Sequence, residues 1–343
     1  MMSLMVSPEL TIAVLPAGRW GLAFGKVVAD SHYNVNIYLR SKEETDRFND
    51  THRHPRYFTD VTLPNNVVAS SSLEQLVSEA EILVLAIPSA HARSFYREIK
   101  PFDNRDADII CLTKGLEEGT NLKMSDVLEE ENPGLISRFT VISGPNFASE
   151  IIHGLPAFTV AASEELGRAR LIQETFTTNT FRIYAQNDLT GIQLGGACKN
   201  VIAIAAGASD GLGFGENARA GLITRGLEEI KRLGIALGGQ ERTFDGLSGQ
   251  GDLWLTCTSP QSRNHELGFE LAKGKTLAQL FESGTVYEGY FTAKAMIELA
   301  KEKGVSVPIA EVVYEVLYQN LSILSAVGRL RGRTLTIEND HLL

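Results

Sequence analysis

The feature that most constrains this chain is a stretch, residues 194–207, that would be apolar on every side of a helix. Its sequence is LGGACKNVIAIAAG. A helix that is hydrophobic all round is a buried one, yet Lys199 and Asn200 lie inside this stretch. A buried ammonium needs partners or loses its proton. We therefore expect the active site to be assembled around Lys199; the alternative is that Lys199 extends to solvent from a helix end.

Length and composition indicate an ordinary two-domain globular protein. The chain has 343 residues, of which 43% are apolar and 22% charged, and this length favours two domains over one. No apolar run reaches the roughly 20 residues of a membrane span, and the N-terminus does not resemble a signal peptide. Cys111, Cys198 and Cys257 are far apart in the sequence, so we interpret them as reduced core thiols of a cytoplasmic protein, with no metal site.

The net charge of −10 argues against nucleic acid as a partner. An anionic small substrate would need a local basic pocket that works against this overall field.

The first half of the chain begins like a dinucleotide-binding fold. An apolar run at 11–15 predicts a buried parallel strand, followed by a helix at 22–30 and a second strand at 35–39. The glycine fingerprint between strand and helix is matched at Gly18 and Gly21, but its first position is Pro16. Gly18 and Gly21 still allow close approach of a pyrophosphate to the helix N-terminus, although a plain strand–helix turn would have the same pattern.

The end of the second strand suggests which cofactor is accepted. An NAD-specific site usually has an acidic residue there, whereas this chain has Arg40 and Lys42. Both suit a 2′-phosphate, so NADP should be accepted as well as NAD. The alternative is that Arg40 is a solvated loop charge that stacks on the adenine.

Further strands are predicted at 81–87, 108–112, 139–142, 159–162 and 181–184, with a short helix at 72–80. In doubly wound sheets, ligands bind beyond the carboxyl ends of the strands. Pro88, Lys114 and the Gly144–Asn146 turn follow consecutive strands, so we expect them at one crevice. As a lone residue, Lys114 could equally be a merely exposed lysine.

From residue 188 onward the pattern is almost entirely helical. The glycine-dense segment 209–219 is either a flexible cover or a tight turn between helices. Asp252 opens an apolar turn and is either a helix cap or the partner of a buried lysine. Arg263 and Asn264, after Ser262, offer a guanidinium fork and an amide for a phosphate. Amphipathic helices are predicted at 220–237, 276–282, 292–303, 309–319 and 323–330.

These patterns predict an α/β fold with two domains. Residues 1–188 would form a Rossmann-type doubly wound domain that binds a dinucleotide. Residues 189–343 would form an all-helical domain that carries the substrate and catalytic residues.

Several blocks resemble one known family. They are TKGLE at Lys114, SGPNFASE at Gly144, GGACKNVIAIAAG at Lys199, GLGFGENARA, GQGDLWLTCTSPQSRN from Gly249, and VYEG ending at Gly289. In order and spacing they are similar to the bacterial NAD(P)-dependent sn-glycerol-3-phosphate dehydrogenases. That resemblance implies interconversion of glycerol 3-phosphate and dihydroxyacetone phosphate with NAD or NADP, a role in phospholipid synthesis, and a homodimer.

The resemblance also implies roles for individual residues. Lys199 would be the general acid/base, and Lys114 would contact substrate and nicotinamide. The residues that would orient the reacting groups are Asn200, Asp252 and Thr256. Those that would hold the substrate, besides both lysines and Asp252, are Gly144, Asn146, Ser262, Arg263 and Asn264. Those that would contact the dinucleotide are Gly18, Arg19, Trp20, Gly21, Arg40, Tyr57, Lys114, Ala148, Arg263, Val286 and Glu288.

The chain departs from the family pattern at a few positions. Pro16 and Arg19 replace a glycine and a serine of the phosphate loop, Asn146 replaces a serine, Gln250 a leucine and Phe291 an arginine. Two other functions share parts of the pattern. A 3-hydroxyacid or ketopantoate-type dehydrogenase would place a carboxylate at Arg263, and a non-catalytic nucleotide sensor would bind the cofactor without turnover.

Overall fold

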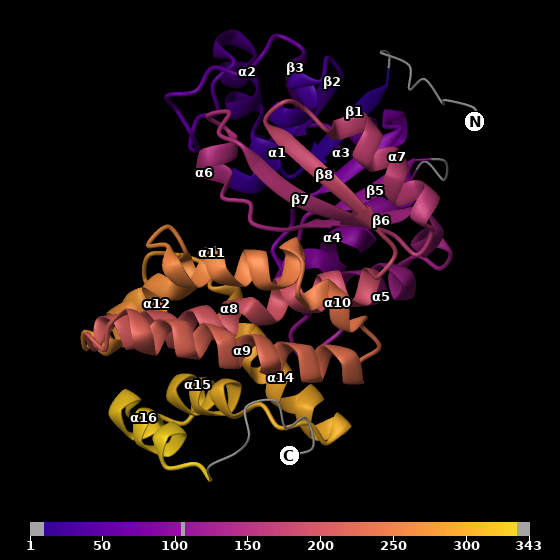
Figure 1. Ribbon diagram of the computed structural model, residues 1–343. Helices are drawn as coiled ribbons and strands as arrows, with labels where there is room; N and C mark the ends of the chain where they lie inside the picture. The colour runs from indigo at the N-terminus through magenta and orange to yellow at the C-terminus, as the bar shows by residue number, and fades with distance from the viewer. Residues whose placement is uncertain (1–9, 104–106, 335–343) are drawn as a thin grey trace. The chain divides into compact units, whose positions relative to one another are not determined.

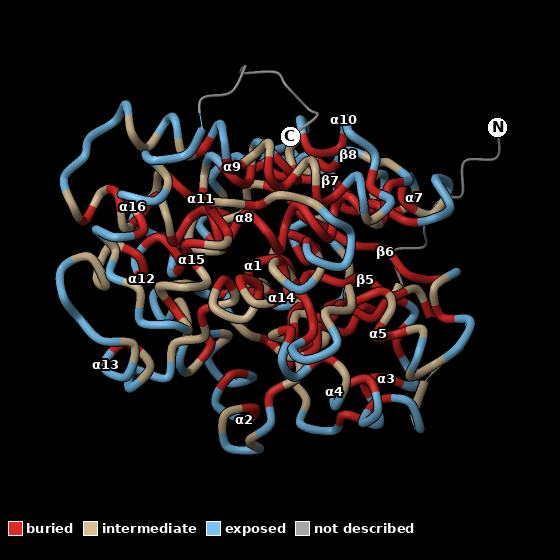
Figure 2. Tube along the Cα trace, turned by 90° about the horizontal axis from the view of Figure 1, so that it is seen from below, coloured by how far each residue is buried: buried red, intermediate tan, exposed pale blue. Residues whose placement is uncertain are grey.

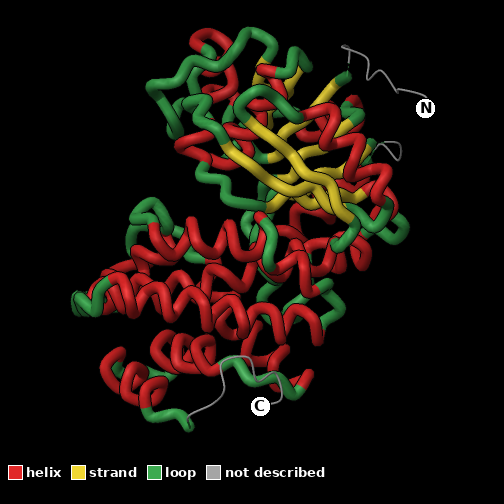
Figure 3. The backbone as a smooth tube through the Cα atoms, viewed as in Figure 1, coloured by secondary structure: helices red, strands yellow, loops and turns green. Residues whose placement is uncertain are grey.

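A computed structural model describes residues 10–103 and 107–334. The chain divides into two compact units. The nucleotide unit contains the described residues up to Lys114 together with Leu122–Leu189, and the helical unit contains Gly115–Asn121 together with the described residues from Thr190 onward. The described strands belong to the first unit, and the second is built from helices (Figure 3). The expected fold class, a Rossmann-type sheet followed by a helical domain, is confirmed.

The nucleotide unit is organised around an eight-stranded sheet of order β3-β2-β1-β4-β5-β6-β7-β8 (Figure 1). Neighbouring strands are parallel except β6 and β7, which are antiparallel. The strands are β1 (Thr11–Leu15), β2 (Asn34–Tyr38), β3 (Val67–Ser70), β4 (Ile82–Leu85), β5 (Asp108–Cys111), β6 (Phe139–Ser143), β7 (Ala157–Ala162) and β8 (Phe181–Gln186).

Continuous burial explains why the central strands could be predicted. All four residues of β4 are buried, as are the last four of β1, because a parallel strand in the middle of such a sheet is covered on both faces. Because β4, β5 and β6 are adjacent and parallel, their carboxyl ends lie at the same edge of the sheet. Lys114 and Gly144 follow two of these ends, as the sequence predicted.

The helices of the nucleotide unit are short, and two of them have a serine as the N-cap. The side chains of Ser41 and Ser72 accept hydrogen bonds from the backbone N–H groups of Glu44 and Gln75, which satisfies donors that a helix start leaves free. The helices are α1 (Arg19–Asp30), α2 (Lys42–Thr51), α3 (Leu73–Glu79), α4 (Ala92–Ile99), α5 (Met124–Glu131), α6 (Ala148–Ile151) and α7 (Leu166–Phe176).

The helical unit packs around α8 (Leu189–Gly211), which continues beyond the stretch predicted from the sequence. The other helices are α9 (Glu216–Ala236), α10 (Glu241–Phe244), α11 (Asp252–Thr258), α12 (Arg263–Ala272), α13 (Leu277–Phe281), α14 (Glu288–Lys303), α15 (Pro308–Tyr318) and α16 (Ile323–Arg331). A single π-helical turn, Leu247–Gly251, precedes α11. Between α8 and α9 only residues 212–215 are outside a helix, so the glycine-dense segment forms a tight interhelical turn.

Burial of α8 is nearly complete, as its all-round apolar sequence predicted (Figure 2). Among the described residues it is the one helix whose length and composition would suffice to cross a membrane, with a mean hydropathy of 1.2. However, 89% of that window is buried inside the protein. Its apolar surface is therefore that of a core helix.

The boundary between the units differs from the predicted one in one segment. Gly115–Asn121 belongs to the helical unit, although the sequence analysis assigned it to the first domain. Leu116 is buried in the core of the helical unit, and Asn121 donates a hydrogen bond to Glu298 on α14, at 2.8 Å. These contacts are made far from the segment in sequence, so local patterns did not reveal them.

Candidate active site

Lys199 is buried on α8 with two specific partners. Only 6% of the residue is exposed, which excludes the alternative that it extends to solvent. Its Nζ donates hydrogen bonds to Asp252 Oδ1 at 2.7 Å and to Thr256 Oγ1 at 2.6 Å. Asp252 and Thr256 lie one turn apart on α11, so they face α8 together. Asp252 is thus the carboxylate partner of a buried lysine, one of the two interpretations that the sequence left open.

Close packing of backbones brings α11 against α8. A Cβ on Gly195 would lie 2.9 Å from the Ser248 carbonyl oxygen, and one on Gly249 would lie 2.2 Å from that of Phe244. No side chain larger than hydrogen fits at these two positions without moving the backbone. Gly195 therefore lets the turn before Asp252 approach α8, and Gly249 lets the same turn pack against the end of α10.

Asn200, next to Lys199, is held in a chain of amide hydrogen bonds. Asn264 donates from Nδ2 to Asn200 Oδ1 at 2.9 Å, and the Gly289 N–H donates to Asn264 Oδ1 at 3.0 Å. A Cβ on Gly289 would lie 2.7 Å from the Asn200 carbonyl oxygen. The chain links α8, α12 and the first turn of α14, and it explains why a glycine follows Glu288.

The start of α12 combines a capped helix N-terminus with an exposed guanidinium. Ser262 is the N-cap, and its side chain accepts from the His265 N–H. Arg263 is exposed and donates from one terminal nitrogen to the Val286 carbonyl oxygen at 3.0 Å. This contact fixes the side chain while its remaining N–H groups can still bind an anion. The helix N-terminus adds a favourable electrostatic field for a phosphate.

In the nucleotide unit, the turn after β1 has the form needed for a pyrophosphate. Gly18 is the N-cap of α1, and a Cβ there would meet no atom within 4 Å. A Cβ on Gly21 would lie 2.8 Å from the Pro16 carbonyl oxygen and 2.9 Å from Ala86 Cβ. The open space over Gly18 and the tight contact at Gly21 are the two requirements of a dinucleotide-binding turn. Pro16 in place of a glycine leaves both intact.

Arg19 and Trp20, at the start of α1, point into different surroundings. The Arg19 guanidinium lies over the Phe58 ring, 4.7 Å from its centroid. The Trp20 ring packs against Phe24 and Phe181, with centroids 6.0 and 6.5 Å away. The Trp20 indole nitrogen is buried without a hydrogen-bond partner. The Trp20 side chain is therefore part of the aromatic core, and only its backbone is placed like a phosphate ligand.

Arg40 and Tyr57 lie on the loops beyond β2 and α2. Arg40 is exposed directly before Ser41, the N-cap of α2, and Tyr57 is half-buried. Lys42 is mostly exposed and lies 3.7 Å from Asp46 on its own helix. The exposed guanidinium of Arg40 is free of any ion pair among the described residues, so it can meet a 2′-phosphate.

Lys114, Gly144 and Asn146 come together at the ends of β5 and β6. Lys114 Nζ donates to the Gly144 carbonyl oxygen at 2.7 Å. A Cβ on Gly144 would lie 2.9 Å from Thr159 Cα, so this position needs glycine. Asn146 accepts from Thr159 Oγ1 at 2.8 Å. Ala148 begins α6 and packs against the core of the nucleotide unit.

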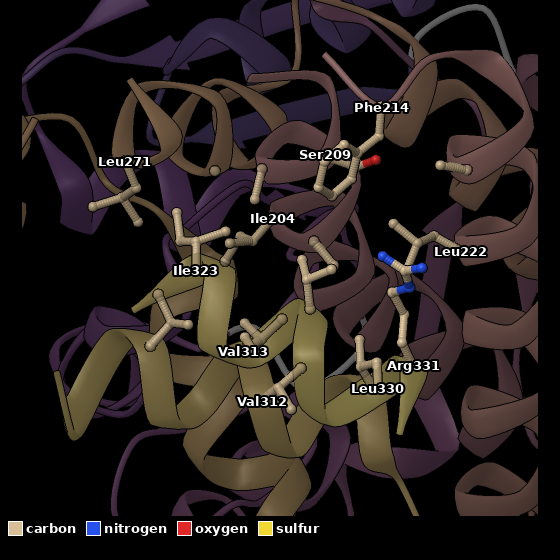
Figure 4. A pocket seen from close by; sticks show the side chains of 17 residues that line it. Ile204, Ser209, Phe214, Leu222, Leu271, Val312, Val313, Ile323, Leu330 and Arg331 are labelled. Atoms are coloured by element: carbon tan, nitrogen blue, oxygen red, sulfur yellow. The ribbon is translucent and has the colours of Figure 1, made fainter. Parts of the chain in front are cut away.

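A cavity of about 370 Å³ lies in the helical unit between α16 and the helices α8, α9, α12 and α15 (Figure 4). Its lining is almost wholly apolar, with Ser209 and Arg331 as the polar members. None of the residues predicted to act in the reaction lines it. We therefore look for the proposed chemistry outside this cavity.

Comparison with known proteins decides the family. A family model described as the N-terminus of NAD-dependent glycerol-3-phosphate dehydrogenase matches residues 11–169, and one described as its C-terminus matches residues 188–328. The chain belongs to the NAD-dependent glycerol-3-phosphate dehydrogenase family. The two matches cover the nucleotide-binding part and the helical part respectively, so the resemblance found in the sequence is confirmed.

Relatives named glycerol-3-phosphate dehydrogenase (NAD(P)+) share this chain over nearly its full length. One from Corynebacterium glutamicum is 41% identical and covers 96% of this chain and 100% of its own. One from Symbiobacterium thermophilum is 43% identical and covers 97% of both chains. A crystal structure of glycerol-3-phosphate dehydrogenase from Coxiella burnetii has a TM-score of 0.89 and 32% identity, covering 95% of this chain and 100% of its own.

A ketopantoate reductase from Ralstonia eutropha shares the fold alone. Its TM-score is 0.60 at 17% identity, and it covers 93% of this chain. Membership of the glycerol-3-phosphate dehydrogenase family therefore rests on the two family models and on the relatives above.

Sequence reasoning missed one buried residue of the nucleotide unit in this member of the glycerol-3-phosphate dehydrogenase family. His54 is only 3% exposed and lies in the loop that carries Tyr57 and Phe58. A histidine beside a proline in a polar loop has no periodicity to mark it as buried. Its burial results from tertiary contacts that no local pattern encodes.

Proposed function

We propose that this protein catalyses reversible hydride transfer between a nicotinamide dinucleotide, NAD or NADP, and the C2 atom of glycerol 3-phosphate or dihydroxyacetone phosphate. The observation that carries the proposal is the buried Lys199, paired with Asp252 and Thr256, in a member of this dehydrogenase family. Such a buried cation with a fixed geometry is suited to meet a reacting oxygen.

Lys199 handles the proton. In the reducing direction, one proton of the ammonium is transferred to the C2 oxygen as the hydride reaches C2: an N–H bond breaks, an O–H bond forms, and a neutral amine and an alcohol remain. In the oxidising direction, the amine takes the proton of the hydroxyl group. Asp252 holds Nζ in place through the 2.7 Å contact. General acid–base help of this kind is worth about 100- to 10,000-fold in rate.

The substrate would be held by Asn200, Ser262, Arg263 and Asn264. The amide chain fixes Asn200 beside Lys199, where its amide can orient the reacting oxygen. The guanidinium of Arg263 and the N-terminus of α12 would bind the phosphate. Lys114 would contact the substrate and the nicotinamide, and Gly144 and Asn146 would line the substrate, on the strength of the family resemblance.

The nucleotide unit fits a dinucleotide. A bound nicotinamide would supply or accept the hydride. Gly18 and Gly21 would cradle the pyrophosphate, helped by the backbone of Arg19 and Trp20. Arg40 would meet the adenosine ribose or its 2′-phosphate. Further contacts to the dinucleotide would come from Tyr57, Lys114, Ala148, Arg263, Val286 and Glu288.

We assign the cellular setting from the family as well. The protein would act in the cytoplasm as a homodimer and supply glycerol 3-phosphate for phospholipid synthesis. Light scattering coupled to size-exclusion chromatography tests the dimer, since a mass near the 37.5 kDa of one chain would contradict it.

A steady-state assay tests the activity. Reduction of dihydroxyacetone phosphate is measured with NADH and with NADPH side by side, and ketopantoate serves as the alternative substrate. We expect turnover of the phosphorylated ketone with both cofactors and none of ketopantoate. Turnover of ketopantoate alone would favour the other dehydrogenase class. Cofactor binding without any turnover would favour a sensor.

A further inference from the structure

The loop between α2 and β3 packs against the turn that is proposed to bind the pyrophosphate. It closes on itself through a hydrogen bond from the Leu63 N–H to the His52 carbonyl oxygen, at 2.8 Å. Phe58, from this loop, carries the Arg19 guanidinium on its ring. Tyr57, the residue before Phe58, is a proposed contact of the dinucleotide. The position of this loop relative to α1 therefore matters for cofactor binding.

His54 holds the loop from inside. Its Nδ1 accepts hydrogen bonds from the backbone N–H groups of Arg56 and Tyr57, each at 3.1 Å. A nitrogen that accepts cannot carry a proton, so the ring proton of a neutral His54 is on Nε2. The backbone of Ala17, in the turn after β1, favours the protonated ring and so acts against the main shift in the pKa of His54.

Ala17 lies between Pro16 and Gly18, in the proposed phosphate loop. Nδ1 of His54 thus caps the Tyr57 loop, and Phe58 of the same loop carries the Arg19 guanidinium at the start of α1. The His54 ring also stacks on Tyr57, with centroids 5.0 Å apart and planes 29° apart. The orientation of the Tyr57 side chain is therefore set by His54 both through the backbone and through the ring.

The surroundings of His54 keep the ring neutral, as its two accepted hydrogen bonds require. Burial is the main cause that lowers the pKa of His54 to about 4, and the charge of Arg56 lowers it further. The Glu44 carboxylate opposes this shift but is itself paired with Arg56 at 2.8 Å. At neutral pH the ring can therefore accept both backbone N–H groups.

We propose that His54 is a positioning residue for the dinucleotide, acting by locking the Tyr57–Phe58 loop onto the phosphate loop. This inference rests on the proposed function. Without the imidazole, two part-buried backbone N–H groups lose their acceptor and the loop samples other arrangements. The apparent cofactor affinity then falls in proportion to the fraction of molecules with the loop in place. The chemical step is unaffected once the cofactor is bound.

The test compares His54→Ala, His54→Asn and a matched control, Leu128→Ala. Leu128 is equally buried in the nucleotide unit, on α5, and the control loses core packing without touching the loop. An asparagine can accept the same backbone N–H groups but cannot stack as imidazole does. The readouts are the Kd of NADPH from fluorescence titration, and kcat and KM for dihydroxyacetone phosphate.

We expect His54→Ala to raise the Kd of NADPH about tenfold, with kcat at saturating cofactor and KM for the substrate within about twofold of wild type. His54→Asn should recover most of the lost affinity. A rise in Kd of the same size in Leu128→Ala would overturn the inference, because general loss of stability would then explain it. Unchanged affinity in His54→Ala would also overturn it.

A double-mutant cycle with Tyr57→Ala separates positioning from a purely structural role. If His54 acts through Tyr57, its substitution should change the Kd of NADPH much less in the Tyr57→Ala background. Fully additive effects would contradict the inference. Should His54→Ala fail to fold, His54→Asn takes its place in the same cycle. Failure of the wild-type protein to bind either cofactor would instead overturn the proposed function, and this inference with it.

Discussion

Lys199 shows that a single residue can indicate a functional site before the fold is known. A lysine in the middle of an apolar helix must have partners, and the structure supplies Asp252 and Thr256. The identity of those partners was less predictable, because Asp252 follows Lys199 by 53 residues and could equally have capped its own helix. The pairing depends on how α11 packs on α8, which the sequence pattern does not encode.

Arg263 provides a prediction at the same scale. We expect Arg263→Ala to raise KM for dihydroxyacetone phosphate at least tenfold, since a charge-assisted hydrogen bond to phosphate contributes about 1.5–3 kcal/mol. KM for unphosphorylated dihydroxyacetone should change little. Steady-state kinetics with both ketones measures this, with Arg242→Ala, an exposed arginine of α10, as the control. An equal rise in KM for both ketones would argue against a phosphate contact.

At the scale of elements, the crossing of α8 and α12 depends on two glycines. A Cβ on Gly268 would lie 1.9 Å from the Ile204 carbonyl oxygen, and one on Gly207 would lie 1.9 Å from that of His265. Both contacts are with backbone atoms, so an alanine at either position would force α8 and α12 apart. This crossing positions Lys199 on α8 and Arg263 on α12 within one rigid unit.

Substitution at this crossing should therefore be costly. We expect Gly268→Ala to lower the free energy of unfolding by about 3 kcal/mol or more, because overpacking forces backbone shifts. Gly221→Ala is the matched control: it is also inside a helix, but its Cβ would meet nothing within 4 Å, so alanine should be neutral or slightly stabilising there. Urea denaturation compares the two. Similar stability of both variants would show that the crossing tolerates separation.

Glu229 joins two further elements. This buried residue of α9 accepts hydrogen bonds from the N–H groups of Ile309 and Ala310 at the start of α15, at 2.7 and 3.1 Å. Burial raises the pKa of Glu229 to about 7, although both backbone bonds oppose the shift. The folded protein therefore binds the carboxyl proton of Glu229 more tightly than the unfolded chain does.

A pH dependence of stability follows, with a definite sign. The free energy of unfolding of the wild-type protein, compared with that of Glu229→Gln, should fall as the pH rises through two values. These are the pKa of Glu229 in the unfolded chain, near 4.5, and its pKa in the folded protein, about 7. The whole change should not exceed about 3 kcal/mol. Denaturation midpoints of both proteins across this range measure it, with the exposed Glu241→Gln as a control. A difference in stability between wild type and Glu229→Gln that does not change with pH would contradict the raised pKa of Glu229.

The elements also differ in how predictable they were. Central strands such as β1 and β4 were found because continuous burial leaves a continuous apolar run. The four-residue edge strand β3 was missed, since its alternate residues are exposed and it resembles a loop. The antiparallel pairing of β6 with β7 could not be predicted, because strand direction is set by the connection and not by the strand's own residues.

For the molecule as a whole, the proposed chemistry is divided between two units. The residues proposed for the dinucleotide are mostly in the nucleotide unit, and Lys199 with its partners is in the helical unit. The change of periodicity near residue 188 predicted this division into sheet and helices. It could not reveal that Gly115–Asn121 joins the helical unit, because that depends on contacts such as Asn121 with Glu298. Local patterns thus predict the content of each unit better than its exact membership.

The most direct test of the account is the turnover of dihydroxyacetone phosphate by Lys199→Ala, with the Kd of NADPH measured on the same sample. We expect the rate to fall by about 100- to 10,000-fold, NADPH affinity to stay near that of wild type, and a small added amine to restore part of the rate. Near-normal turnover in this variant, with cofactor binding intact, would remove Lys199 from the proton transfer and contradict the account.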